Sequence, residues 1–397
     1  MNRRSGLNTR PRELLAGAVS DQIDVRRICT IALAALACSG VFAGTPAGAA
    51  AGQAKLGVYR GGGNSGGVHE FEVWLGRPVD VALDFLAQST WNEIAAPTWW
   101  ASRWGATPYR VVYSVPMLPD SGGTLQQGAG GAYNSYFRQL AQTLLANGEG
   151  DSIVRIGWEF NGSWMRWNAQ ADPAAFVGYW RQIVETMRSV TGTRFAFDWS
   201  PNRGRGSVAP DLAYPGDSYV DYVGMDSYDT GWAEGWQDPV RRWQTMLTEP
   251  YGLEWHRRFA AEHGKQMSYP EWGLWIRDDG HGGGDDPYYI EKMRAWIDAN
   301  DVAYHSYFEY DAPDGQHRLM TGQFPLGAAA FRAAFGPGAA SPPPPPPPLP
   351  PGASSPLVAA PDVPSVRDRK PLPALRRRVR RLARIALARW AGLLAVR

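Results

Sequence analysis

Two glutamates each lie at the end of an apolar, strand-like run, a position from which a carboxylate can take part in catalysis. Glu159 and Glu271 are both followed by an aromatic residue and a short polar or glycine turn. Two carboxylates across a narrow pocket can cleave a glycosidic bond, because one attacks the anomeric carbon while the other, held protonated, releases the leaving oxygen. A strand-end glutamate on its own is as readily explained by a salt bridge or a loop hydrogen bond. It is their pairing that favours the catalytic interpretation.

Other reaction classes find less support in the residues. The six histidines are scattered without H-x₃-H or H-E-x-x-H spacing, and no G-x-S-x-G segment is present, so neither a zinc site nor an esterase is predicted. The acidic loop 278–286 could bind Ca²⁺, but it lacks the EF-hand pattern and is better interpreted as a solvated loop over the cleft. We expect no metal and no cofactor.

The elements that must position these glutamates alternate along the chain. Helical stretches at 134–147, 173–190, 239–263 and 288–300 separate many of the strand-like runs. Alternating strands and helices in fewer than 300 residues predict an α/β fold, a single (β/α)₈ TIM barrel, with a doubly wound open sheet as the alternative. The eight strand-like runs are 55–60, 79–85, 109–118, 152–160, 193–200, 220–228, 265–273 and 303–310.

In such a barrel, chemistry occurs at the carboxyl ends of the strands. Carboxylates end several of the predicted strands and should gather at one rim: Glu159, Asp198, Asp226, Glu271, Glu309 and Asp311, with Tyr228 beside them. Several of the 18 tryptophans should crowd the same rim: Trp158, Trp164, Trp167, Trp199, Trp232, Trp236, Trp272 and Trp275. Indole faces stack on pyranose rings, so a sugar substrate is predicted, although about half of these tryptophans are expected to pack in the core.

The amino end has the order of a secretory signal peptide, which we place at 1–49. Paired arginines precede the apolar run 28–44, and small residues follow it up to Ala49. The alternative is a membrane anchor, and the export route, Sec or twin-arginine, is left open. Both cysteines, Cys29 and Cys38, lie in this run, so cleavage would leave none for disulfides or catalysis.

The eight strand-like runs and the paired glutamates place the expected glycoside hydrolase domain at 50–336. Composition predicts a proline-rich linker at 337–373 and a basic amphipathic tail at 374–397. The tail suits an anionic membrane surface or an envelope polymer, the alternative being a solvated tail. Residues 50–360 carry a net charge of about −10, which argues against nucleic-acid binding. We expect a secreted monomer that its basic tail can hold at the cell envelope.

Three segments resemble glycoside hydrolase family 26, a β-mannanase family. RIGWEFNGSWMRW (155–167) is similar to its acid/base segment, YVDYVGMDSYD (219–229) to its sixth-strand segment and YPEWG (269–273) to its nucleophile segment. The loop at 277–297 also looks like one found in bacterial members. The resemblance covers roughly residues 55–335, and it implies a retaining (β/α)₈ glycosidase acting on β-linked polysaccharide.

The resemblance also implies roles for individual residues. Glu159 becomes the general acid/base and Glu271 the nucleophile, with Arg155 and Tyr228 orienting and hydrogen-bonding the carboxylates. The remaining substrate-binding residues are expected to be Trp158, Trp164, Trp167, Trp199, Asp226 and Trp272. The resemblance implies an endo-β-mannanase-like enzyme that acts on a β-mannan-type polymer. Trp158 stands where the family usually has His, so β-1,3-xylan, mixed-linkage β-glucan and a bacterial exopolysaccharide are left open as other substrates.

Environment then predicts the protonation states. A positive neighbour and a hydrogen bond should keep Glu271 ionised, while the aromatic neighbours of Glu159 should raise its pKa so that it supplies a proton at neutral pH. The alternative from another functional class is a non-catalytic carbohydrate-binding barrel tethered to the envelope. It would keep the tryptophan-lined cleft without needing both glutamates at catalytic separation.

Overall fold

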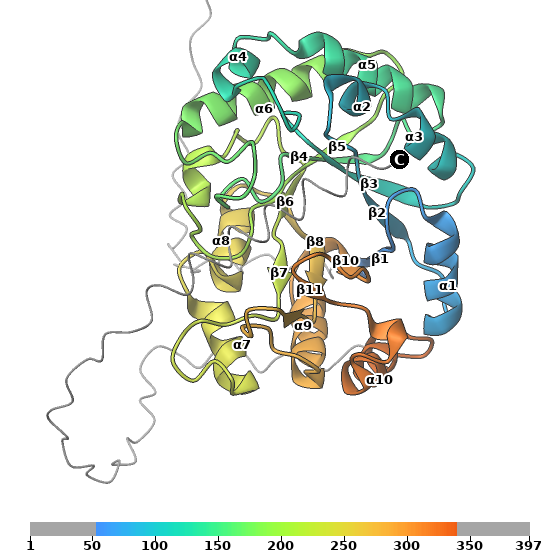
Figure 1. The fold of residues 1–397 in the computed structure, drawn as a ribbon, viewed down its shortest axis with the longest axis vertical. Coiled ribbons are helices and arrows are strands. Elements are labelled where there is room, and N and C mark those ends of the chain that lie inside the picture. The colour runs from blue at the N-terminus through green and yellow to red at the C-terminus, as the bar shows by residue number, and fades with distance from the viewer. Residues whose placement is uncertain (1–52, 340–397) are drawn as a thin grey trace, which may run out of the picture. The chain divides into compact units, whose positions relative to one another are not determined.

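A computed structural model describes residues 53–339, and in it eight parallel strands close into a barrel (Figure 1). The barrel closes because the last strand pairs with both the first strand and its own predecessor, which excludes the open-sheet alternative. A short strand, β7 (Ser227–Tyr228), continues beside β8 beyond the end of β6. The barrel strands in order are β1 (Lys55–Tyr59), β2 (Val81–Phe85), β3 (Arg110–Val115), β4 (Ile153–Ile156), β5 (Ala196–Trp199), β6 (Tyr222–Gly224), β8 (Gln266–Gly273) and β10 (Val302–Phe308).

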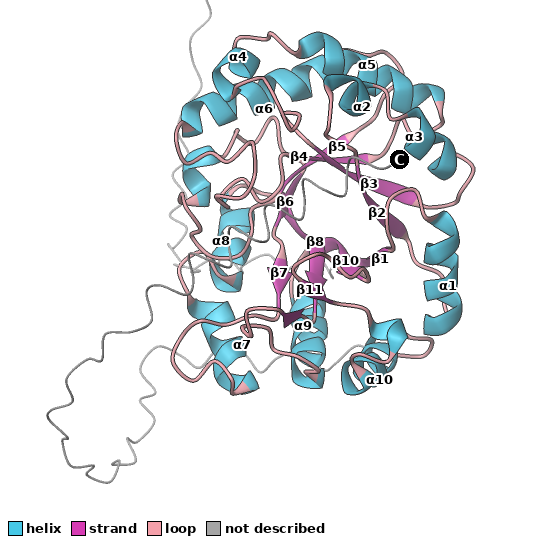
Figure 2. Cartoon of the chain, viewed as in Figure 1, coloured by secondary structure: helices cyan, strands magenta, loops and turns pink. Residues whose placement is uncertain are grey.

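Helices surround the barrel (Figure 2). Three of them begin at an Asp-Pro pair, at Asp172, Asp238 and Asp286, where the carboxylate accepts a backbone N–H of the first turn and the proline occupies a position that needs no donor. The α-helices are α1 (Ser65–Leu75), α2 (Trp91–Ala95), α3 (Thr98–Trp104), α4 (Leu125–Ala129), α5 (Asn134–Ala146), α6 (Pro173–Arg188), α7 (Pro239–Thr248), α8 (Leu253–Glu262), α9 (Pro287–Ala299) and α10 (Pro325–Phe335). The smaller elements are the 3₁₀ turns η1 (Pro210–Ala213) and η2 (Leu319–Thr321) and the paired strands β9 (Ile276–Arg277) and β11 (Gly315–Gln316).

The strand expected over 220–228 is two short strands, β6 and β7, and two further predicted elements differ from the structure. The single helix expected over 239–263 is two helices, because Pro250 lacks the N–H that a continuing helix needs and Tyr251 adopts a left-handed φ of 61°. The fourth strand was expected to run to 160 but ends at Ile156. Gly157 and Glu159, with φ of 54° and 52°, turn the chain sharply there.

The barrel interior changes from apolar to polar along its axis. A cluster of buried side chains fills part of the interior, including Val81, Leu83, Val112 and Ile153. Asp198 lies among polar groups and accepts hydrogen bonds from Ser268 Oγ and from Tyr304 Oη at 2.7 Å. Such a filled interior is a packed core rather than a pore, so ligands must approach from an end.

The signal-like segment, most of the predicted linker and the basic tail lie outside the described residues. Within 53–339, no helix has the length and hydropathy needed to cross a membrane.

Candidate active site

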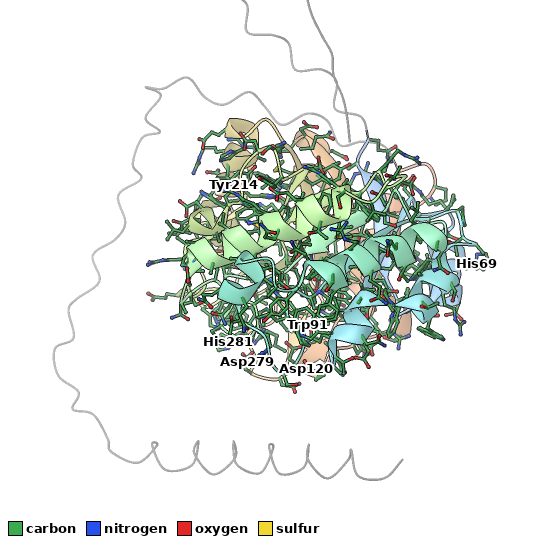
Figure 3. The ribbon with its side chains drawn as sticks, turned by 90° about the horizontal axis from the view of Figure 1, so that it is seen from above. His69, Trp91, Asp120, Tyr214, Asp279 and His281 are labelled. Atoms are coloured by element: carbon green, nitrogen blue, oxygen red, sulfur yellow. The ribbon has the colours of Figure 1, made fainter. Side chains whose placement is uncertain are left out.

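A cleft of about 630 Å³ opens among the loops at the carboxyl ends of the strands. Figure 3 shows Trp91, Asp120, Asp279 and His281, all from segments that follow carboxyl ends of strands, along one edge of the molecule. Side chains from the ends of five barrel strands, β4, β5, β6, β8 and β10, and from the segments that follow them line the cleft: Glu159, Trp164, Asn202, Arg203, Tyr228, Thr230, Trp232, Glu249, Glu271, Trp275, Arg277, Phe308, Ala312, Asp314 and His317. Both predicted catalytic glutamates therefore lie in the same cleft.

Glu271 is held from two sides at the carboxyl end of β8. The Arg155 guanidinium lies 2.5 Å from its Oε1, and Tyr228 donates a hydrogen bond of 2.9 Å to its Oε2. These are the two contacts expected from the sequence. The cation and the hydroxyl donor together fix the orientation of this carboxyl group.

Glu159 lies in the sharp turn after β4. Its φ of 52° is unusual for a residue with a Cβ, and its backbone N–H donates to Ser200 O at 2.8 Å, which ties the turn to the neighbouring strand end. Non-glycine residues in this conformation cost about 1–3 kcal/mol and cluster at functional sites. In the sequence, the residue that could indicate this turn is Gly157, because glycine adopts a positive φ without steric cost.

The pKa of Glu159 is raised to about 7. Burial is the main cause, followed by the negative charge of Glu271, while a 2.8 Å hydrogen bond from Trp164 Nε1 opposes the shift. The direction agrees with the expectation from sequence. Its causes include the second carboxylate, which sequence neighbours alone do not reveal.

Arg155 is fully buried beneath Glu271 and is not among the residues that line the cleft, so it orients Glu271 rather than contacting a ligand directly, which corrects its expected substrate-binding role. It pairs with Asp226 as well as Glu271, and its Nη1 donates to Ser114 Oγ at 2.9 Å. Asp226 accepts a further hydrogen bond from Ser200. Asp226 is itself completely buried, so it positions Arg155 beneath the cleft rather than contacting a ligand directly, which corrects its expected substrate-binding role.

The predicted aromatic residues divide into two groups. Trp164 is 61% exposed and lines the cleft. Trp158 is buried, packed against Trp167 with the two rings tilted and their centroids 4.6 Å apart, and it is not among the lining residues.

Three of the predicted substrate-binding tryptophans are core residues. Trp167 is fully buried and donates to Trp158 O. Trp199 and Trp272 are also fully buried, because on a strand the side chains alternate and both follow a residue that points into the barrel. Trp199 packs against aromatic side chains, including Phe160 and Phe259, and Trp272 packs against others, including Tyr307 and Phe331.

We therefore expect Trp199→Ala to change stability and Trp164→Ala to change substrate binding. Removing the buried Trp199 ring should lower the free energy of unfolding by about 3–5 kcal/mol and leave KM unchanged below the melting temperature. Removing the exposed Trp164 ring should raise KM with little change in stability. Denaturant unfolding and kinetics on the same two proteins test this, and a raised KM for folded Trp199→Ala would contradict it.

The other strand-end carboxylates do not face the cleft. Glu309 is buried and accepts hydrogen bonds from the N–H groups of Leu319 and Met320. Asp198 is buried within the barrel, and Asp311 accepts from the His317 N–H. The expectation that all of them gather at one open rim is therefore wrong, because buried backbone donors and hydroxyls need acceptors there.

Several lining residues were not predicted, among them Asn202, Arg203 and Asp314. Asn202 and Arg203 follow β5, so the strand-end rule that selected Glu159 would have found them. Arg203 and Arg277 both have carboxylate partners, Glu249 and Asp279. No comparable signal marks Asp314, which lies in a long loop after β10.

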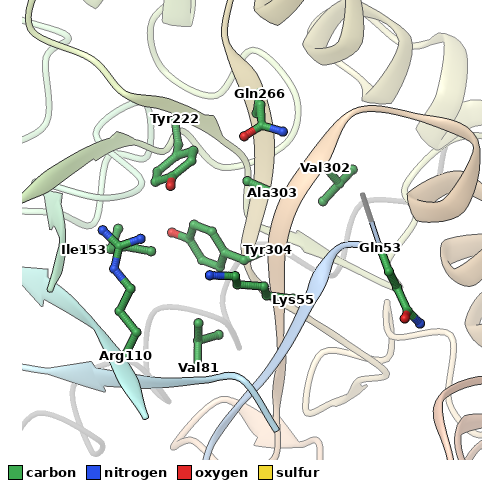
Figure 4. A pocket seen from close by; sticks show the side chains of 10 residues that line it. All are labelled: Gln53, Lys55, Val81, Arg110, Ile153, Tyr222, Gln266, Val302, Ala303 and Tyr304. Carbon is green, nitrogen blue, oxygen red and sulfur yellow. The ribbon is translucent and has the colours of Figure 1, made fainter. Parts of the chain in front are cut away.

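A smaller cavity of about 240 Å³ lies at the amino ends of the strands (Figure 4). It is lined by Lys55, Arg110, Tyr222 and Tyr304 and by two glutamines and several apolar side chains. No carboxylate is among these lining residues. Of these two cavities, only the cleft at the carboxyl ends of the strands holds paired glutamates. Across residues 53–339, no three His, Cys, Asp or Glu side chains gather as metal ligands would.

Tyr228→Phe tests the hydrogen bond to Glu271 with minimal change in shape. Losing one donor to a charged group costs about 1.5–3 kcal/mol, so kcat should fall roughly 10- to 100-fold. Tyr222→Phe, at the far end of the barrel, is the matched control. Unchanged kcat for Tyr228→Phe would show that this hydrogen bond does not assist the reaction.

A closed (β/α)₈ barrel whose carboxyl-end cleft holds two glutamates is the arrangement of a barrel glycosidase. Residues 115–243 match the family described as Glycosyl hydrolase family 26, so the resemblance inferred from the sequence is confirmed over that part of the chain.

Known proteins similar to this chain agree with that fold. An endo-β-1,4-mannanase double mutant of Cellulomonas fimi superposes with a TM-score of 0.51 at 20% identity, covering 71% of each chain. A family 26 protein of Muricauda sp. superposes with a TM-score of 0.52 at 14% identity, covering 72% of this chain and 86% of the other. Endoglucanase H of Acetivibrio thermocellus is 24% identical over 128 residues, which is 30% of this chain and 14% of that protein.

Proposed function

We propose that this protein is a secreted retaining glycoside hydrolase that cleaves a β-linked polysaccharide of the β-mannan type. In this mechanism Glu271 is the nucleophile and Glu159 the general acid/base. The observation that carries the proposal is the difference between the two carboxyl environments. Glu271 contacts Arg155 and Tyr228, whereas the pKa of Glu159 is raised by burial and by the charge of Glu271.

The two environments supply the two roles that retention requires. Ionised Glu271 attacks the anomeric carbon and forms a glycosyl–enzyme ester, while protonated Glu159 gives its proton to the departing glycosidic oxygen. Glu159, now a carboxylate, then takes a proton from water, whose oxygen attacks the same carbon and releases Glu271. Two inversions leave the product with the configuration of the substrate.

The polymer is proposed from the relatives. One structural relative is named an endo-β-1,4-mannanase, which supports β-mannan over the other β-linked polymers. The exposed tryptophans Trp164 and Trp232 suit the C–H faces of a pyranose chain. The signal-like segment 28–44 supports export, and the basic tail supports retention at an anionic envelope surface.

The test is product analysis with the full chain on galactomannan, glucomannan, β-1,3-xylan, mixed-linkage β-glucan and cellulose. Oligosaccharide release from the mannans is expected, and proton NMR of the first product formed should show the β-anomer. An initial α-anomer would show that the enzyme inverts the anomeric configuration. Release of oligosaccharides only from another polymer would show that β-mannan is not the substrate. Binding without release would favour a carbohydrate-binding barrel.

A further inference from the structure

The aromatic side chains that line the cleft continue beyond it, toward the loop that follows β1. Ring centroids of Trp275 and Tyr228 are 5.1 Å apart, those of Tyr228 and Phe308 are 5.8 Å apart, and those of Phe308 and Tyr310 are 6.2 Å apart. Trp275, Tyr228 and Phe308 line the cleft, whereas Tyr310 does not. Tyr310 is 42% exposed, so a ring continuous with the site faces solvent outside it.

A loop without side chains runs beside this ring. Gly61, Gly62 and Gly63 follow β1, and the first and third have positive φ values of 102° and 60°. A Cβ on Gly61 would lie 3.4 Å from the Tyr310 ring, and one on Gly63 would lie 2.5 Å from the Trp99 ring. The three glycines therefore form a floor flanked by two aromatic rings.

The second ring, that of Trp99, is also open to solvent. Hydrogen bonds hold the helix that carries it next to the glycine loop. Trp99 is 50% exposed, and the Arg103 guanidinium lies 4.8 Å from its ring centroid. The buried Asp84 carboxylate accepts both the Gly63 N–H at 2.8 Å and the Trp104 Nε1–H at 2.6 Å. Since Trp99 and Trp104 both belong to α3, Asp84 fixes the glycine loop relative to the helix that carries Trp99.

We propose that Trp99, Tyr310 and the Gly61–Gly63 floor form a distal sugar subsite, which binds a neutral pyranose unit of the same chain that is cut between Glu159 and Glu271. This inference rests on the proposed function for the identity of the ligand. Its occupant follows from continuity, because unbroken ring contacts join Tyr310 to Tyr228, which donates to Glu271. Flat aromatic faces beside a bare backbone suit the C–H patches of a sugar ring.

A subsite there has a consequence for the mode of action. A polymer that occupies both the cleft and the glycine floor extends beyond the cleft on the β1 side, so cleavage occurs inside the chain rather than only at its end. The contribution of the subsite depends on substrate length: a short oligosaccharide fills the cleft alone, whereas a long one also reaches Trp99 and Tyr310.

The experiment measures binding separately from catalysis. In the full chain carrying Glu271→Ala, dissociation constants for mannobiose and mannohexaose are determined by calorimetry, alone and with Trp99→Ala or Tyr310→Ala added. Each added change should weaken hexaose binding up to about tenfold, the effect of one aromatic stacking contact, and leave biose binding unchanged. Tyr310→Phe keeps the ring and should bind as the parent, as should Leu326→Ala, which removes an exposed side chain from α10.

Each result separates the subsite from the proposed reaction. Loss of the length-dependent gain in Trp99→Ala and Tyr310→Ala supports the subsite even if the unmodified protein cleaves nothing, in which case only the hydrolase proposal fails. Equal hexaose affinity in all variants overturns the subsite, whether or not the protein cleaves mannan. Equal losses for biose and hexaose also overturn it, because they would indicate a general structural effect.

Discussion

Glu271→Ala should abolish polysaccharide cleavage, with kcat falling on the order of 10⁵-fold. The physical reason is that the variant lacks the group that forms the covalent intermediate, and loss of a catalytic nucleophile has effects of this size. The Arg155 guanidinium and the Tyr228 hydroxyl would then face an empty position. Reducing-end assays on mannan and thermal unfolding of the same protein measure activity and folding separately.

A small carboxylate should partly restore the activity of this variant. Sodium formate can occupy the position vacated by the Glu271 side chain, next to Arg155, and attack the anomeric carbon in its place. Glu291→Ala, at an exposed position on α9, is the matched control and should keep full activity. More than 1% residual kcat in folded Glu271→Ala without formate would exclude Glu271 as the nucleophile.

Glu159→Ala should separate substrates by their leaving groups. A sugar leaving group needs a proton, so kcat/KM on mannan should fall about 10²- to 10⁴-fold, the usual contribution of a general acid. A dinitrophenyl β-glycoside departs without a proton, so formation of its glycosyl–enzyme should be nearly as fast as in the unmodified protein. A burst of dinitrophenol followed by slow turnover is expected, because Glu159 is also needed to activate water.

The pH dependence of the unmodified protein follows from the same residue. Glu159 must carry its proton to act as an acid, and its pKa is raised to about 7 by burial and by the Glu271 charge. Activity on mannan should therefore hold up to about pH 7 and fall as the pH rises further, when the acid becomes ionised. In Glu159→Gln this alkaline decline should be absent. If the decline persists at the same pH, another group titrates there.

The sequence predicted the architecture because local signals and global fold agree. Apolar runs of strand length alternate with helices, and the Asp-Pro pairs at 172, 238 and 286 begin three of those helices as capping rules require. The errors occurred where backbone conformation departs from periodicity, at the left-handed turn of Gly157 and Glu159 and at Tyr251. Such turns depend on contacts like Glu159 N–H to Ser200 O, which periodicity does not contain.

Some of the predicted site residues lie in the cleft and others do not. Glu159, Glu271, Tyr228 and Trp164 line the cleft as expected. Trp199 and Trp272 do not line the cleft. Strand alternation could have predicted this, because each follows a carboxylate that points into the barrel and so must itself point outward. Trp167 had no such signal, because its burial depends on how the loop after β4 folds over Trp158.

By itself the sequence determined which groups are available for chemistry and at which ends of which strands they stand, because hydrophobic periodicity fixes strands and turns locally. Only the tertiary structure decided which of these groups meet. Arg155 contacts Asp226 and Glu271 across the barrel interior, and those pairings, like the burial that raises the pKa of Glu159, come from barrel closure. The physical reason is that charge interactions and desolvation depend on distance through space, while sequence specifies only distance along the chain.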